Sequence, residues 1–185
     1  KEREEILRIL KEASEVIKEK ADELINSLWN FSQIEFIFSK MNFCARNGFN
    51  KQNIVNSQEL NLKKAYNPLI DKDVVVKNDV ILDNKGNSLI ITGPNTGGKT
   101  VILKTVGLCV YLSHLGFYIP ALEESTVGFF EDVFVDVGDE QSIENNLSTF
   151  SSHMTNIIDI LNKTNDKSII LLDELCSGTD PSEGA

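Results

Sequence analysis

The stretch Gly93-Pro94-Asn95-Thr96-Gly97-Gly98-Lys99-Thr100 guides the interpretation of the whole sequence. It fits the pattern G-x-x-x-x-G-K-[ST] at every fixed position, and it joins an expected strand, residues 88–92, to an expected helix, residues 100–115. Glycines let backbone N–H groups turn toward phosphate oxygens, and a helix N-terminus adds partial positive charge. We therefore expect a phosphate cradle in which Lys99 reaches the β- and γ-phosphates and Thr100 ligates Mg²⁺.

A second motif lies farther along the chain, where the apolar run Ile169-Ile170-Leu171-Leu172 ends in Asp173-Glu174. A buried strand that presents carboxylates at its C-terminal tip, downstream of a phosphate cradle, is typical of Walker-type ATPases. We expect Asp173 to hold Mg²⁺ through water and Glu174 to act as the general base on the attacking water. The two adjacent acids favour ATP hydrolysis, with ATP and Mg²⁺ as ligands, over binding alone.

Strands and helices alternate around these two motifs, which predicts an α/β fold with a mostly parallel sheet flanked by helices. The expected strands are residues 74–76, 80–82, 88–92, 133–137 and 168–172. The expected helices are residues 100–115 and a segment from near Thr149 to Leu161. Residues 71–185 would form this domain, and the Asn- and Lys-rich residues 47–70 would connect it to the preceding segment.

Residues 1–46 form that preceding segment, and they read as one long helix or two helices in line. Leu10, Ile17, Leu24, Phe31 and Phe38 recur every seven residues, which gives a heptad-like apolar face. We expect this face to pack on its own domain or on a neighbour. A self-dimerising coiled coil is the alternative, although polar residues interrupt the neighbouring stripe.

Composition narrows the functional class. The chain has 185 residues, 41% of them hydrophobic, and a formal net charge of −10. Residues 1–70 hold 11 Lys and Arg against 10 Asp and Glu, whereas residues 71–185 hold 7 against 18. The acidic second part argues against a nucleic-acid groove there, because such grooves need clustered Lys and Arg. The three cysteines form no CxxC pair and no long apolar run exists, so we expect a cytoplasmic protein without a membrane span.

The sequence resembles the ATPase core of the MutS family, most closely the second bacterial, recombination-suppressing branch. The runs that carry this resemblance are 91–101, 138–144, 147–154, Asp173-Glu174-Leu175 and Gly178-Thr179-Asp180-Pro181. Two departures are Tyr66-Asn67, where the family usually has Arg-His, and Cys176-Ser177, where the branch commonly has small residues.

The resemblance implies a P-loop NTPase of the ABC type that works as a homodimer in DNA repair or in suppression of recombination. Ser148 and Thr149 would be the signature that caps the γ-phosphate bound by the other subunit; a plain helix N-cap is the alternative. The N-terminal helix would be a lever to a DNA clamp. Branched or recombination DNA, or the ribosome, would bind outside residues 1–185. The chain ends before the family's switch histidine, so we expect weak hydrolysis from it alone.

Three points stay open at the level of sequence. His153 either approaches the γ-phosphate region or is a packed or solvent-facing residue. Another ABC-type or SMC-like ATPase is an alternative, although a Leu-Ser-Gly-Gly-Gln signature is absent. A nucleotide-gated dimerisation module without turnover is the non-enzymatic alternative, although Glu174 is present.

Overall fold

The computed structural model describes residues 1–83, 88–94, 97–137 and 146–174, with the backbone alone over 146–152. The chain divides into two compact units, Lys1–Phe43 and Cys44–Ala185. The cradle positions Asn95 and Thr96 lie outside the described residues, as do the run 138–145 and everything after Glu174. Each unit is considered by itself below.

The first unit is helical. It consists of α1 (Glu2–Glu19) and most of α2 (Ala21–Asn47), so the helical prediction for residues 1–46 is confirmed as two helices that meet at Lys20. Acidic residues occupy the first turn of each helix, where they complement the helix dipole. Large apolar side chains such as Leu10 and Phe31 are exposed in both helices. Among the described residues, no helix is both long enough and apolar enough to cross a bilayer.

The second unit begins with a four-stranded sheet. Its strands are β1 (Asn53–Val55), β2 (Leu60–Ala65), β3 (Asn78–Leu82) and β4 (Thr126–Gly128), in the spatial order β1-β4-β2-β3. β1 and β4 are parallel, whereas β2 is antiparallel to both β3 and β4. No helix separates β2 from β3 along the chain, so the connection returns the strand in the antiparallel sense.

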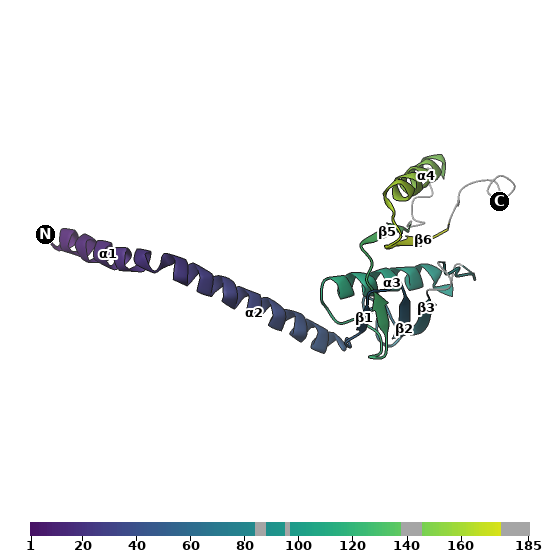
Figure 1. The fold of residues 1–185 in the computed structure, drawn as a ribbon, viewed down its shortest axis with the longest axis horizontal. Helices are drawn as coiled ribbons and strands as arrows, with labels where there is room; N and C mark the ends of the chain where they lie inside the picture. The colour runs from purple at the N-terminus through teal and green to yellow at the C-terminus, as the bar shows by residue number, and fades with distance from the viewer. Residues whose placement is uncertain (84–87, 95–96, 138–145, 175–185) are drawn as a thin grey trace. The chain divides into compact units, whose positions relative to one another are not determined.

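The remaining elements of the second unit form layers beyond this sheet (Figure 1). Helix α3 (Lys99–His114) lies over the four-stranded sheet, and on its other side β5 (Asp132–Asp136) pairs in parallel with β6 (Ser168–Leu172). Helix α4 (Asn146–Lys163) connects these two strands. A helical crossover between adjacent parallel strands is the expected connection.

A single apolar core joins these layers around α3. Val106, Cys109 and Val110 of α3 belong to one buried cluster with residues of β2 and β6, including Leu62 and Leu171. Burial of a side chain of this size contributes roughly 1.5–3 kcal/mol, so packing on both sides fixes α3 between the two sheets.

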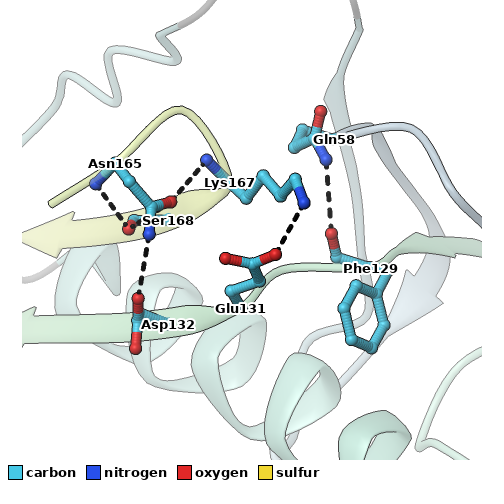
Figure 2. A network of polar contacts seen from close by, with 7 residues as sticks. All are labelled: Gln58, Phe129, Glu131, Asp132, Asn165, Lys167 and Ser168. Atoms are coloured by element: carbon cyan, nitrogen blue, oxygen red, sulfur yellow. Dashed lines mark hydrogen bonds and ion pairs between the residues drawn. The ribbon is translucent and has the colours of Figure 1, made fainter.

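Polar contacts fix the end of the β5–β6 pair at which both strands begin (Figure 2). Lys167 donates to Glu131 across this end at 2.6 Å, and Asn165 donates to Asp132 at 3.4 Å. The ion pair is exposed, so solvent screens it and it adds little to stability. These contacts lie where both strands begin, and the opposite end, where both strands finish, carries Asp136 and is followed by Asp173.

The prediction of a P-loop fold of the ABC type with a mostly parallel sheet is wrong for this structure. The larger sheet is mixed, and the parallel β5–β6 pair is a separate sheet of two strands. Residues 88–92 are not a strand: Leu89 and Ile90 are exposed, and no strand of the described residues pairs with them. Residues 74–76 are not a strand either, and Val74 lies in a turn.

Other sequence predictions hold. The strand predicted at 80–82 is part of β3, and those at 133–137 and 168–172 are β5 and β6. The helices predicted after the cradle and near Thr149 are α3 and α4. The failed predictions share one cause, because an apolar run becomes a strand only when a neighbouring strand satisfies its backbone groups.

Candidate functional site

The glycine-rich segment 93–100 leads directly into α3. Gly93 has φ 149° and Gly98, the N-cap of α3, has φ 80°, values that L side chains rarely adopt. The Gly97 N–H donates to the Pro94 carbonyl oxygen at 2.9 Å. Gly98 has no side chain to cap the helix, so first-turn N–H groups of α3 lack a side-chain acceptor at the N-cap. Such a helix start favours an anion.

Lys99 folds back over this segment. Its Nζ donates to the Gly93 carbonyl oxygen at 2.8 Å, although the two residues are six positions apart. The ammonium is therefore held beside the first residue of the segment.

Thr100 and Asp173 are brought together by the tertiary structure. The Thr100 hydroxyl donates to the Asp173 carboxylate, which connects the first turn of α3 to the residue that follows β6. Both side chains are partly buried. A hydroxyl oxygen and a carboxylate oxygen are the hard ligands that Mg²⁺ prefers.

Close packing of α3 on β6 explains why these two residues meet. Gly107 of α3 faces Leu171 of β6 so closely that an added Cβ would lie 2.8 Å from Leu171 Cδ1. A glycine therefore permits the helix to approach the strand. This approach places the start of α3 beside the end of β6, where Asp173 follows.

Glu174 stands apart from this pair. Its side chain is exposed, and its backbone has φ 47°, in the left-handed region that non-glycine residues seldom occupy. No hydrogen bond joins it to another residue of the described ranges. The structure therefore places Glu174 next to Asp173 in sequence, with its carboxylate directed into solvent.

Asp136 is a site residue that the sequence analysis did not single out. It is the last residue of β5 and is 8% exposed, and its backbone carbonyl accepts the Asp173 N–H at 2.9 Å. Its carboxylate accepts from His153 Nδ1 at 3.0 Å and from Asn156 Nδ2 at 2.8 Å. An acid at the end of the predicted strand Val133-Phe134-Val135 was the available signal.

These contacts settle the environment of His153. Its ring is partly buried against Asp136, with 31% of the side chain exposed. Because an ionised carboxylate only accepts hydrogen bonds, Nδ1 carries the proton in this contact. Of the two sequence interpretations of His153, the structure shows a residue packed against an acid.

A metal site made from protein side chains alone is not present in the described part of the chain. Among those residues, no group of three or more His, Cys, Asp or Glu is placed to hold a metal ion. The Asp136 carboxylate is already engaged by two donors. Thr100 and Asp173 nevertheless fit Mg²⁺, because this ion commonly takes one or two protein oxygens and completes its shell with water and phosphate.

The remaining predicted positions are described only in part. Ser148 and Thr149 lie in the first turns of α4, but their side chains are outside the described residues. Asn95 and Thr96 of the cradle are outside them altogether. The structure therefore brings together the two ends of the predicted site, residues 97–100 and Asp173.

Comparison with known proteins agrees with the sequence resemblance. Residues 89–185 match the family model described as MutS domain V. Over all 185 residues, the chain is 50% identical to a protein named Endonuclease MutS2 from Caldanaerobacter subterraneus subsp. tengcongensis. It is 46% identical to the protein of that name from Bacillus mycoides, and 47% identical to that from Bacillus cytotoxicus. The chain covers 23% of the first relative and 24% of each of the other two.

Proposed function

The chain belongs to the MutS family, and from this premise we propose that it is the nucleotide-binding part of a dimeric ATPase that acts on DNA. The family model matched by residues 89–185 and the relatives' high identity support this proposal. The process served would be DNA repair or the suppression of recombination. The chain spans about a quarter of the length of these relatives. We assign DNA contact to segments outside residues 1–185, because residues 71–185 are strongly acidic.

In the proposed reaction, ATP binds along residues 93–100 with its phosphates at the start of α3. First-turn N–H groups of α3 donate to phosphate oxygens, and the helix dipole favours their negative charge. The Lys99 ammonium exchanges its contact with the Gly93 carbonyl for the β- and γ-phosphate oxygens. Since this exchange replaces a neutral acceptor by a charged one, it strengthens the hydrogen bond.

Thr100 and Asp173 would hold Mg²⁺, Thr100 directly and Asp173 through water. When bound, this ion neutralises charge that develops on the phosphate oxygens. The hydrogen bond between the two residues keeps both oxygens on the same side of the α3–β6 contact. Glu174 would accept a proton from the attacking water, and its exposed carboxylate is available for this role. Ser148 and Thr149 would complete the site of the second subunit.

The contact between Thr100 and Asp173 is the observation that carries the proposal. Two residues that are 73 positions apart, and that sequence motifs assign to one metal ion, are hydrogen-bonded to each other. The relatives are named endonucleases, but we assign the described residues to the nucleotide and not to strand cleavage.

The test is equilibrium binding of a slowly hydrolysed ATP analogue to the full-length protein, with and without Mg²⁺. Thr100→Val removes the hydroxyl at nearly constant volume, and we expect it to abolish most of the Mg²⁺-dependent gain in affinity. Thr105→Val is the matched control, because Thr105 lies on the same helix and its hydroxyl donates to the Val101 carbonyl instead. Equal behaviour of the two variants, or no binding by the wild type, would contradict the proposed site.

Hydrolysis is tested separately. Glu174→Gln keeps the side-chain size but removes the base, so we expect analogue binding to persist while turnover falls about 100-fold or more. Unchanged turnover would show that Glu174 is not the base. Wild-type binding without any turnover would instead support a nucleotide-gated module.

A further inference from the structure

Asp136 connects helix α4 to the end of the β5–β6 pair. Its carboxylate accepts one hydrogen bond from His153 and one from Asn156, both on α4. These two residues are three positions apart and therefore share one face of the helix. The same residue receives the backbone N–H of Asp173 through its carbonyl oxygen. One buried acid thus contacts both α4 and the segment that carries the predicted metal ligand.

The carboxylate of Asp136 depends on these two donors. Only 11% of its side chain is exposed, so water can only partly replace a hydrogen-bond partner that is lost. A buried charge left without partners is strongly destabilised. Movement of α4 away from β5 would break both hydrogen bonds at once, and the acid therefore resists that movement.

The described side chains of α4 bury little apolar surface. Of the described side chains of α4, Ile160 is the one buried hydrophobic residue, at 5% exposure. Ile158 and Leu161 are exposed. Met154 and Ile157 are partly buried, so the contacts with Asp136 add to limited apolar packing in orienting α4.

We propose that Asp136 is a positioning residue that, through His153 and Asn156, holds α4 in register with Asp173 and Thr100. This inference rests on the proposed function, in which the first turns of α4 complete the nucleotide site of a second subunit. Asp136 does not touch the nucleotide in this arrangement. Asp136 affects turnover by fixing the position of α4 relative to the end of β6 that precedes Asp173. His153 contributes a hydrogen bond to Asp136 and does not transfer a proton.

The primary test compares Asp136→Asn with Asp132→Asn in the full-length protein. Asp132 is the matched control, because it lies at the other end of β5 and its carboxylate accepts a 3.4 Å hydrogen bond from Asn165. We expect Asp136→Asn to lower kcat about 10- to 100-fold, as loss of an orienting partner commonly does, with the Kd of the ATP analogue within about twofold of wild type. The control should retain wild-type kcat.

A second pair of variants separates positioning from proton transfer. Asn at position 153 places an amide N–H close to where Nδ1 lies, so His153→Asn keeps the contact with Asp136 but removes the titrating ring. His153→Ala removes the contact. We expect near wild-type kcat for His153→Asn and a fall in kcat for His153→Ala. Because His153 is partly exposed, this pair carries the test if Asp136→Asn fails to fold.

Hydrogen exchange gives a readout that does not depend on nucleotide. Amides in residues 153–163 should exchange faster in His153→Ala than in wild type, with little change in Asp132→Asn. Three results would overturn the inference: unchanged exchange in α4, equal loss of kcat in His153→Asn and His153→Ala, or a parallel loss of analogue affinity. A wild-type protein that binds no nucleotide contradicts the proposed function itself, whereas wild-type binding with any of these three results contradicts only the inference.

Discussion

Replacement of Gly107 by alanine tests the close approach of α3 to β6. An added Cβ would lie 2.8 Å from Leu171 Cδ1. Carbon atoms in contact prefer about 3.5–4.0 Å, so one group must move by about 0.7–1.2 Å. Leu171 is 6% exposed, and its side chain can move only by displacing other core atoms. Thr100 and Asp173 lie beyond this contact, so the same displacement would disturb their hydrogen bond.

The expected change in the free energy of unfolding is the difference between two opposing effects. Overpacking in a well-packed core costs about 1–3 kcal/mol. Alanine gains about 1 kcal/mol over glycine in a helix interior. We therefore expect Gly107→Ala to lower the free energy of unfolding by about 1 kcal/mol, within a range of about 0–2 kcal/mol. A glycine in open space would give the opposite sign.

Pulsed thiol labelling of Cys109 is the appropriate assay. Cys109 belongs to the same core and is fully buried, and burial raises the pKa of its thiol to about 12, so it reacts only when this unit opens. Labelling across a urea titration, read by mass spectrometry of the Cys109 peptide, gives the stability of the second unit alone. The signal of Trp29 would instead report the first unit.

A double-mutant cycle with Leu171→Val supplies the control. Valine lacks the Cδ1 atom, so by itself it should cost about 1 kcal/mol through lost packing. In combination it relieves the contact with the new Cβ, and we expect a favourable coupling of at least about 0.5 kcal/mol. A stabilising Gly107→Ala, or additive effects of the two substitutions, would refute the claim that this glycine sets the spacing of α3 and β6.

Three further predictions concern the second unit. Gly128→Ala should lower the free energy of unfolding by about 3 kcal/mol or more, because the added Cβ would lie 2.2 Å from the Ser57 carbonyl oxygen and neither backbone can move away. Urea unfolding measures this loss, and a variant with the wild-type midpoint would contradict the prediction. The Lys64 backbone N–H donates to the Asp79 carboxylate and holds the pKa of Asp79 below its usual value. The stability that this hydrogen bond contributes is therefore present above the ordinary carboxyl pKa and is lost as pH falls through the lowered pKa. An NMR titration in which Asp79 shows an ordinary pKa would contradict the prediction. Cys109 should resist alkylation in the folded protein at pH 8 to 9, where an exposed thiol of ordinary pKa, about 8.5, reacts; rapid labelling without denaturant would show that the core is open.

The sequence predicted individual elements of this protein better than their arrangement. Apolar segments after the cradle and near Thr149 located α3 and α4, and a compact β-branched or aliphatic run ending in an acid located β5 and β6. The same reasoning failed at residues 88–92 and 74–76, where apolar residues stay exposed. Strand formation depends on partners distant in sequence, which a local pattern does not contain.

The residues of the candidate site also divide into those that a sequence motif predicts and those that only the folded structure reveals. Two sequence motifs predicted Lys99, Thr100 and Asp173 as site residues, because phosphate and magnesium chemistry favour those residue types at short range or at a strand end. Asp136 escaped notice, since nothing in its local sequence indicates that two α4 side chains converge on its carboxylate.

By itself, then, the sequence indicated the family and the positions of α3, β5 and β6, and it predicted which residues form the cradle and which acids serve it. Only the tertiary structure decided that the larger sheet is mixed, that α3 lies between two sheets, and that Thr100 meets Asp173. The physical reason is the sequence distance over which each interaction acts. Helical periodicity and ligand preference depend on residues close together in sequence. Strand pairing and the Gly107–Leu171 contact join segments that are far apart in sequence and meet only when the chain folds.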